Sequence, residues 1–260
     1  MKKSNKFKNE NIKIYSFYWD NIDLRLVDAQ RKVFESFGFK IEQHHRHGMD
    51  HGLWIEEVLN SAEENEIIII VDIDCIPLNL EAVQKAIAIA DNGGIFGCAQ
   101  SANHIDYRYI YAAPMFCAIK AKTWQSLGCP SLQADENFDV GGRMTSIAAQ
   151  KGINIEMAYP SHSAVPKWLL GDKYIYGLFT IYNNSFLHLF ESRKKYLIDC
   201  FVDLSIEIVS GIEPIDYKKY IIRAADESHK IYALKYYMKK SIRGKIIREY
   251  FRLKKRITNW

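Results

Sequence analysis

Two aspartates end the most hydrophobic run of this 260-residue chain, in the segment IIIIVDIDCIPL. Asp72 and Asp74 are separated by one residue, so on a β-strand their carboxylates point to the same face. Two such groups repel each other, and one of them would ordinarily take up a proton. A hard divalent cation, Mn²⁺ or Mg²⁺, removes this conflict because it prefers oxygen ligands and keeps positions for water and phosphate. The pair therefore indicates a site for a metal and a diphosphate. The alternative is that one aspartate caps a turn and the other is solvated.

The residues before the pair predict a central strand. Residues 66–72 are almost entirely Ile and Val, which is typical of a parallel strand covered by helices on both faces. Pro77 cannot donate to a strand ladder, so the strand must end near Asp74. Ligands of open α/β sheets bind at the carboxyl ends of the strands. We therefore expect the two acids to lie at the ligand-binding edge of a sheet.

Strand and helix patterns alternate through the first 210 residues or so, with short connections. This predicts an α/β fold with an open, mostly parallel sheet sandwiched by helices. The predicted strands cover residues 12–19, 39–45, 66–72, 94–100, 112–120 and 154–160, with an extended piece that ends near His188. The predicted helices cover 23–37, 49–64 and 79–93, and another opens at the sequence DVGGRM. Since no linker divides this part of the chain, we expect one catalytic domain over residues 1–212.

The C-terminal part, residues 213–260, has a different character. Residues 215–260 carry 14 Lys and Arg against four Asp and Glu, whereas the whole chain has 35 against 31. From Ile231 to Ile257 apolar residues recur every three or four positions, which predicts a basic amphipathic helix. Such a tail could bind an anionic membrane surface or fold back on the domain. Nucleic acid is not an expected partner, because the chain has no RNP motif, KH loop or zinc finger.

The remaining bulk features indicate a cytoplasmic location, with peripheral attachment to the inner face of a membrane as the role of the tail. The basic N-terminus is not followed by an apolar stretch, so a cleaved signal is not expected. No segment approaches the roughly 20 apolar residues that a membrane-spanning helix needs. The five cysteines are scattered without CxxC spacing, which is typical of reduced, buried thiols.

The segment IIIIVDIDCIPL resembles the DxD segment of nucleotide-sugar glycosyltransferases of the GT-A fold. The resemblance covers about residues 12–193, judged by the order of the strands. It implies that Asp72 and Asp74 hold a divalent cation, and that Asp72 thereby helps to bind the diphosphate of the donor. The segment FLHLFESR is similar to the late segment in which many of these enzymes place a metal-binding histidine, which implies His188 as a third ligand. His162, in YPSHS, is the competing candidate.

The segment ADENFDVGGRMTSIAAQKG is similar to the acidic segment that opens a helix beside the acceptor in these enzymes. If the reaction inverts the anomeric carbon, a carboxylate must take the proton of the acceptor hydroxyl. The resemblance implies Glu136 or Asp135 in that role, without a choice between them, and Asp139 is the third candidate. Asp139 could instead be the N-cap of a helix that begins at Val140.

Four further residues are candidates for holding the donor. Tyr15 and Phe17 end the first strand, where the related enzymes hold the nucleobase, although core packing would also explain them. His47 belongs to HHRHGMDHG, which contains four of the eight histidines of the chain. We expect this segment to hydrogen-bond nucleotide or phosphate, because it lacks an HExxH pair or a cysteine cluster for zinc. Arg193 could contact the diphosphate or pair with an acid at the surface.

These residues predict metal-dependent transfer of a sugar from a nucleotide-sugar donor to a glycan or lipid-linked acceptor. One alternative is a haloacid-dehalogenase-like phosphatase, in which the first aspartate of a DxD is the nucleophile. However, Ile76 stands where that family has Thr or Val, and GDKYIY ends in Tyr176 where an aspartate is expected. A non-enzymatic adaptor that binds anionic surfaces through its basic tail is the second alternative.

Overall fold

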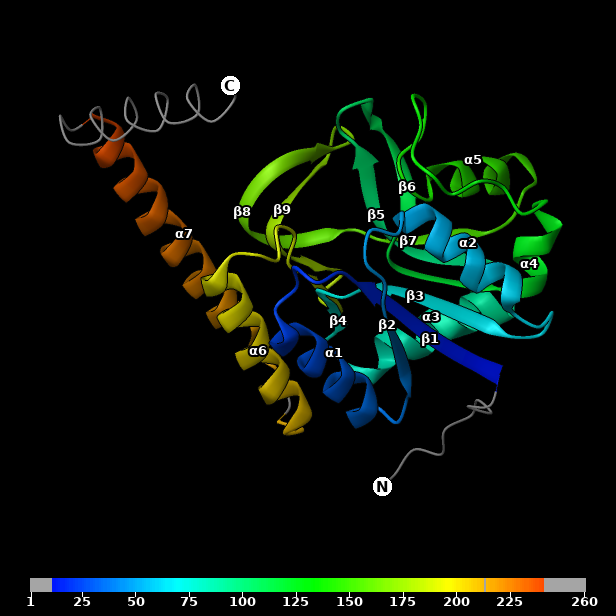
Figure 1. Ribbon diagram of the computed structural model, residues 1–260, viewed down its shortest axis with the longest axis horizontal. Helices are drawn as coiled ribbons and strands as arrows, with labels where there is room; N and C mark the ends of the chain where they lie inside the picture. The colour runs from blue at the N-terminus through cyan, green and yellow to red at the C-terminus, as the bar shows by residue number, and fades with distance from the viewer. Residues whose placement is uncertain (1–10, 213, 241–260) are drawn as a thin grey trace.

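The computed structural model describes residues 11–212 and 214–240, the last eight of them as backbone only. Six strands form the main sheet, in the order β2-β1-β3-β6-β5-β7 (Figure 1). Their bounds are β1 Ile12–Tyr18, β2 Ile41–His45, β3 Ile67–Asp72, β5 Ile95–Ala102, β6 Asp106–Lys120 and β7 Ile155–Ala158. Three of the five pairings are parallel, and the antiparallel strand is β6. The predicted α/β class with a mostly parallel sheet is confirmed.

The direction of β6 follows from its connection. Only residues 103–105 join β5 to β6, and a connection this short can link antiparallel strands but not parallel ones. β6 begins six residues before the predicted strand over 112–120, because its first half pairs with β5 beyond the part that pairs with β3.

Helices cover both faces of β3, which explains its uninterrupted Ile and Val residues. Ile67, Ile69 and Val71 pack with α1 and α3 on one face, whereas Ile68 and Ile70 pack with α2, α4 and α5 on the other. The helices are α1 Leu24–Ser36, α2 His51–Ser61, α3 Leu80–Asp91, α4 Ala121–Ser126, α5 Gly142–Gln150, α6 Lys195–Val209 and α7 Tyr217–Lys240. By the two-residue period of a strand, Asp72 continues the α2 face.

A second, antiparallel sheet was not predicted. Its order is β4-β10-β9-β8, with bounds β4 Cys75–Pro77, β10 Phe186–His188, β9 Tyr174–Tyr182 and β8 Pro160–Leu170. The predicted strand over 154–160 is thus divided, because β7 ends at Ala158 in the main sheet and β8 begins at Pro160 in the second. Pro77 lies in the edge strand, where a missing N–H is tolerated. The chain passes from one sheet to the other between Asp72 and Cys75.

Helices α6 and α7 lie along one side of the molecule (Figure 1). Tyr220 and Ala224 of α7 are buried in the cluster that contains α1 and α6, so the first turns of α7 belong to the packed body. Two basic residues there, Lys219 and Arg223, pair with acids of α6. Most of the predicted amphipathic stripe, and residues 241–260, lie outside the described side chains, so the boundary at residue 212 stays a prediction. Within residues 11–212 and 214–240, no helix has the length and hydropathy to cross a bilayer.

Candidate metal centre

Three of the predicted site residues meet where the two sheets join. Asp72 ends β3, Asp74 lies in the turn that follows, and His188 ends β10 opposite Cys75. One ligand atom from each lies within 4.8 Å of the others. The Nε2 atom of His188 is 3.0 Å from Oδ1 of Asp74 and 3.5 Å from Oδ2 of Asp72. The structure brings His188 to the aspartates, whereas the exposed ring of His162 faces Tyr217 at 5.8 Å.

The local geometry of the pair differs from the prediction in one respect. β3 ends at Asp72 and residues 73–74 form a turn, so Asp74 does not share a strand face with Asp72. The turn is held from α1 by Gln30, which is fully buried and donates from Nε2 to the carbonyls of Asp72 at 2.7 Å and Cys75 at 2.9 Å. The two carboxylates therefore converge because of a buried amide on a neighbouring helix.

Burial governs the electrostatics of the group. The side chains of Asp74 and His188 are 10% and 7% exposed, while that of Asp72 is 27% exposed, so the site opens on the side of Asp72. The pKa of Asp72 is raised, mainly by burial and to a smaller extent by the charge of Asp74. The charges of His51 and His188 lower this pKa but do not outweigh burial. Burial alone would lower the pKa of His188, but the charge and hydrogen bond of Asp74 and the charge of Asp72 outweigh it, so this pKa is raised. When no cation is present, the two neighbouring carboxylates therefore favour the protonated form of His188.

The donor set fits a hard divalent cation. Mn²⁺ accepts carboxylate oxygens and an imidazole nitrogen as ligands, whereas Mg²⁺ would be held mainly by the carboxylate oxygens. The Nδ1 atom of His188 is buried and has no hydrogen-bond partner among the described residues, so the polar contacts of this ring are all on the Nε2 side, toward the acids. We conclude that Asp72, Asp74 and His188 could hold a divalent cation.

The ring of His188 is positioned by the residues that follow it. Phe190 packs edge-on against it with a centroid separation of 4.0 Å and 67° between the planes. Phe190 has a φ of 51°, in the left-handed region that a bulky residue rarely adopts. Such strain persists only where the surrounding structure imposes it, so the packing around the segment after β10 holds this conformation.

Of the predicted donor residues, Phe17 lies closest to the acids. It pairs with Asp72 in the β1–β3 register, and its ring stacks on His51 and Trp54 at centroid distances of 5.5 and 5.1 Å. Tyr15 lies two residues further back on the same face and tilts against His44. An aromatic surface therefore continues from the acid pair along the carboxyl end of β1.

His47 and Arg193 do not contact the three metal-site residues. His47 is 84% exposed and pairs through Nδ1 with Asp20, which also contacts Nε2 of His45 at 2.5 Å. Arg193 lies exposed on the turn after Phe190, and its guanidinium makes no ion pair with a described residue.

The three candidate bases have different surroundings. Asp135 accepts hydrogen bonds from the backbone N–H of Asn137 and Phe138, both at 2.8 Å, and pairs with Arg143. The backbone hydrogen bonds, ahead of Arg143, lower the pKa of Asp135. Glu136 is exposed and forms no hydrogen bond with the described residues.

Asp139 accepts from the backbone N–H of Val140 at 2.9 Å and influences Tyr111, a residue that the sequence did not single out. Tyr111 is 1% exposed, and its pKa is raised by burial, by the charge of Asp139, by Tyr176, by a hydrogen bond with Asp139 and by Asp72. The alternative role of Asp139 as an N-cap is wrong. α5 begins at Gly142, and its N-cap is Gly141, whose φ of 81° suits glycine.

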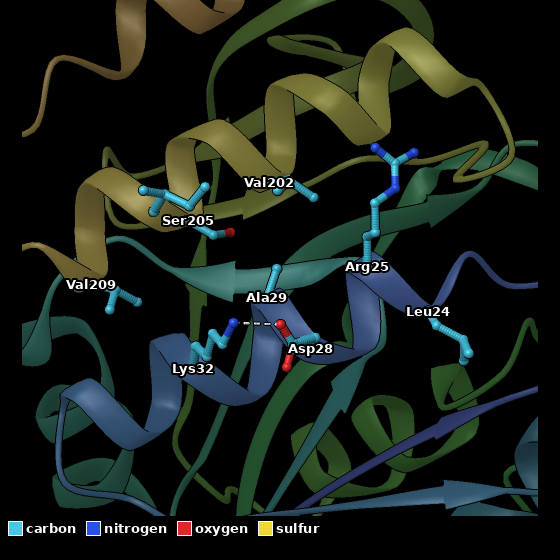
Figure 2. Close-up of a pocket in the computed structure, with 9 residues that line it drawn as sticks. Leu24, Arg25, Asp28, Ala29, Lys32, Val202, Ser205 and Val209 are labelled. Carbon is cyan, nitrogen blue, oxygen red and sulfur yellow. Dashed lines mark ion pairs between the residues drawn. The ribbon is translucent and has the colours of Figure 1, made fainter.

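A concave surface lies between α1 and α6, away from these residues (Figure 2). It measures about 560 Å³, and its rim carries Leu24 and Ile206, which are 67% and 62% exposed. Figure 2 also shows the ion pair of Asp28 with Lys32, two of the lining residues on α1. None of the predicted site residues lines this groove, so it is not the candidate metal centre.

Comparisons with known proteins give matches among solved structures only. No family model matches the chain, and no curated protein matches it. Among solved structures, it is similar to a mutant of the Drosophila β-1,4-galactosyltransferase 7 in complex with manganese, UDP-Gal and xylobiose. The identity is 11%, the alignment covers 68% of this chain and 70% of that chain, and the TM-score is 0.40. This is a likeness in the arrangement of elements alone, so any function must be argued from the site.

Proposed function

We propose that this protein is a metal-dependent glycosyltransferase that transfers a sugar from a nucleotide-sugar donor to a glycan or glycolipid acceptor. The observation that carries the proposal is the convergence of Asp72, Asp74 and His188 at the carboxyl end of β3, within 4.8 Å of one another. In open α/β sheets this edge binds ligands. A cation held there would act as a Lewis acid on the departing diphosphate.

We assign the nucleobase to the aromatic surface beside Asp72. The ring of Phe17 supports this assignment, because stacking on Trp54 and His51 already fixes its orientation. Tyr15 would border the same surface. Arg193, exposed on the turn behind His188, is assigned to the diphosphate. A donor contact from His47 would require its pair with Asp20 to open.

For an inverting reaction, we assign the general base to Asp139. A base must lie within hydrogen-bond reach of the acceptor hydroxyl that attacks beside the metal. Asp139 accepts from the backbone N–H of Val140 and makes no ion pair with a described residue, and the effects of both Asp139 and Asp72 on the pKa of Tyr111 support a place for it on the side of the metal centre. In contrast, Asp135 is occupied by two backbone N–H groups and Arg143.

The assignment of the base predicts a separation of turnover from binding. Asp139→Asn should lower kcat by about 10²- to 10⁴-fold, the usual contribution of a general base, while manganese affinity stays unchanged. Glu136→Gln is the matched control in the same loop and should keep wild-type turnover. Turnover would be measured with the donor and acceptor found by screening. Full activity of the Asp139 variant together with an inactive Glu136 variant would move the base to Glu136.

The metal centre is tested by nucleotide binding. Thermal unfolding would be followed with UDP, GDP, CDP and CMP, each with Mn²⁺ or with EDTA. One nucleotide should stabilise the protein only when Mn²⁺ is present, by about 2.7 kcal/mol at 100 times its Kd. Asp74→Asn should remove this stabilisation, whereas Asp20→Asn, at the exposed acid–histidine cluster, should keep it. Stabilisation that survives in the Asp74 variant would contradict the proposal.

We further assign the acceptor to a lipid-linked or surface polysaccharide, reached through the basic C-terminal residues at an anionic membrane surface. The test is flotation of the full chain with vesicles that contain phosphatidylserine, compared with a chain that ends at Lys240. This end point keeps Tyr220 and Ala224, which pack in the body. Equal flotation of both chains would contradict a role for residues 241–260.

A further inference from the structure

We propose that His51 is a positioning residue of the metal centre, whose imidazole holds the Asp72 carboxylate in the orientation that faces Asp74 and His188. The inference rests on the proposed function only in requiring a cation at these three residues. Nothing in the sequence distinguishes His51 from its neighbours, since it is one of four histidines in HHRHGMDHG.

The two oxygens of Asp72 face two different imidazoles. Nε2 of His51 lies 3.4 Å from Oδ1, and Nε2 of His188 lies 3.5 Å from Oδ2. His51 is not a member of the group whose ligand atoms lie within 4.8 Å of one another. It therefore contacts a ligand without joining the ligand set. Residues in this position usually fix the orientation of a metal-binding carboxylate, and losing them weakens metal binding.

The ring of His51 is itself held in place. It stacks on Phe17 at 5.5 Å with 14° between the planes, and on Trp54 at 6.1 Å with 25°. The indole of Trp54 is anchored by a hydrogen bond from Nε1 to Nδ1 of His44, 3.0 Å long. A ring packed in this way keeps few rotamers, so it can present its nitrogen to Asp72 at little further loss of entropy.

The backbone at His51 is fixed as well. His51 is the first residue of α2, whose N-cap Asp50 accepts from the N–H of Leu53 at 3.0 Å. One residue before this N-cap, the carbonyl oxygen of Met49 accepts a hydrogen bond from the indole N–H of Trp19. The next residue is Gly52, where a Cβ would lie 2.7 Å from the backbone of Gln133. This close approach requires glycine, and it fixes the start of α2 against the loop that carries the acidic segment.

The other histidines of the segment have partners elsewhere. His45 and His47 pair with Asp20, and His44 accepts from Trp54. Among the described residues of this segment, His51 alone contacts an acid of the metal centre. The segment therefore supplies a matched control, because His47 has the same residue type but no contact with the acids.

The experiment is a manganese titration without nucleotide, followed by the EPR signal of free Mn²⁺. His51→Phe keeps a ring for the stack on Phe17 and removes the N–H donor. It should weaken manganese binding about 10- to 100-fold, the usual effect of losing a group that orients a ligand, while the melting temperature in EDTA stays that of the wild type. His51→Gln retains an N–H donor and should bind manganese more tightly than His51→Phe. His47→Phe should bind like the wild type.

The outcomes separate this inference from the proposed function. If Asp74→Asn loses manganese and His51→Phe binds it like the wild type, the role of His51 is overturned and the metal centre stands. Weaker binding by His51→Gln than by His51→Phe also overturns it. If the wild type itself binds neither Mn²⁺ nor Mg²⁺, the metal centre and the role of His51 fall together. If His51→Phe does not fold, His51→Met replaces it as the variant without an N–H donor. The role of His51 then requires that His51→Gln bind manganese more tightly than His51→Met.

Discussion

Two clusters of acids and histidines lie near the carboxyl ends of the central strands, and they differ mainly in burial. Asp20, His45 and His47 form the exposed cluster, with side chains 53% to 84% accessible. Asp72, Asp74 and His188 form the buried cluster, in which the side chains are 27%, 10% and 7% accessible. Water can solvate the charges of the first, whereas the second must neutralise its charges within the protein. The comparison shows that residue type alone does not mark a metal site.

The clusters also differ in how they are assembled. β1 and β2 are adjacent parallel strands, so the residues that follow them meet at one edge without further help. The buried cluster needs two sheets, because His188 comes from β10 and lies 114 residues from Asp74. A pair formed by neighbouring loops can be incidental. Bringing two buried acids and a histidine together from distant elements requires many stabilising contacts, of which the hydrogen bonds of Gln30 are two.

The largest expected effect is the loss of the histidine from the buried cluster. In EDTA, His188→Ala should lower the free energy of unfolding by about 3 kcal/mol, because it leaves buried acids without their partner. The matched variant of the exposed cluster, His47→Ala, should lower it by less than about 1 kcal/mol. Urea unfolding at pH 6 measures both. Similar losses in the two variants would show that burial does not separate the clusters.

A smaller effect is the pH dependence of the metal-free protein. The pKa of His188 is raised above its ordinary value of 6.5. Protonated His188 therefore contributes its whole stabilisation of the folded state below pH 6.5, and this stabilisation is lost as the pH rises through the folded-state pKa. The melting temperature in EDTA should fall over this window, while the stabilisation by Mn²⁺ should grow because the proton must leave before the metal binds. His188→Ala should flatten both trends, and trends that persist in this variant would assign them to another group.

The smallest effect is expected from the acid of the exposed cluster. Asp20→Asn should change the free energy of unfolding by no more than about 1 kcal/mol, since exposed pairs contribute little. It should leave manganese affinity unchanged in the EPR titration. A tenfold weaker affinity would show that the exposed cluster supports the metal centre after all, through the loop that leads to His51.

Several elements could be predicted from local sequence because local interactions form them. The Ile and Val run of β3 becomes a strand with a helix-covered face on each side. Asn79 caps α3 by accepting from the N–H of Ala82, and Gly93 adopts the positive φ that ends the helix region. These features depend on contacts within a few residues, so their signals lie in the sequence itself.

Other elements were predicted only in part or not at all, because their partners are distant. The extended piece predicted to end near His188 corresponds to β10, which ends at that residue. β8 and β9 owe their strand structure mainly to each other and to β10, and α6 to its packing against α1 and α7. Gln30 had one available signal, since it is a polar residue among the buried positions Leu26, Ala29, Val33 and Phe34 of α1. His51 and Tyr111 had none, because an exposed histidine segment and a strand tyrosine look the same whether or not an acid faces them.

The amino-acid sequence by itself determined the α/β class, the end of β3 at the two aspartates, and the residue types that a cation would need. These follow from periodicity, propensity and ligand chemistry, which act over a few residues. Only the tertiary structure decided that His188 rather than His162 faces the acids, and that a turn held by Gln30 brings Asp74 beside Asp72. The physical reason is that these contacts join residues far apart in the chain, and they exist only once both sheets have packed.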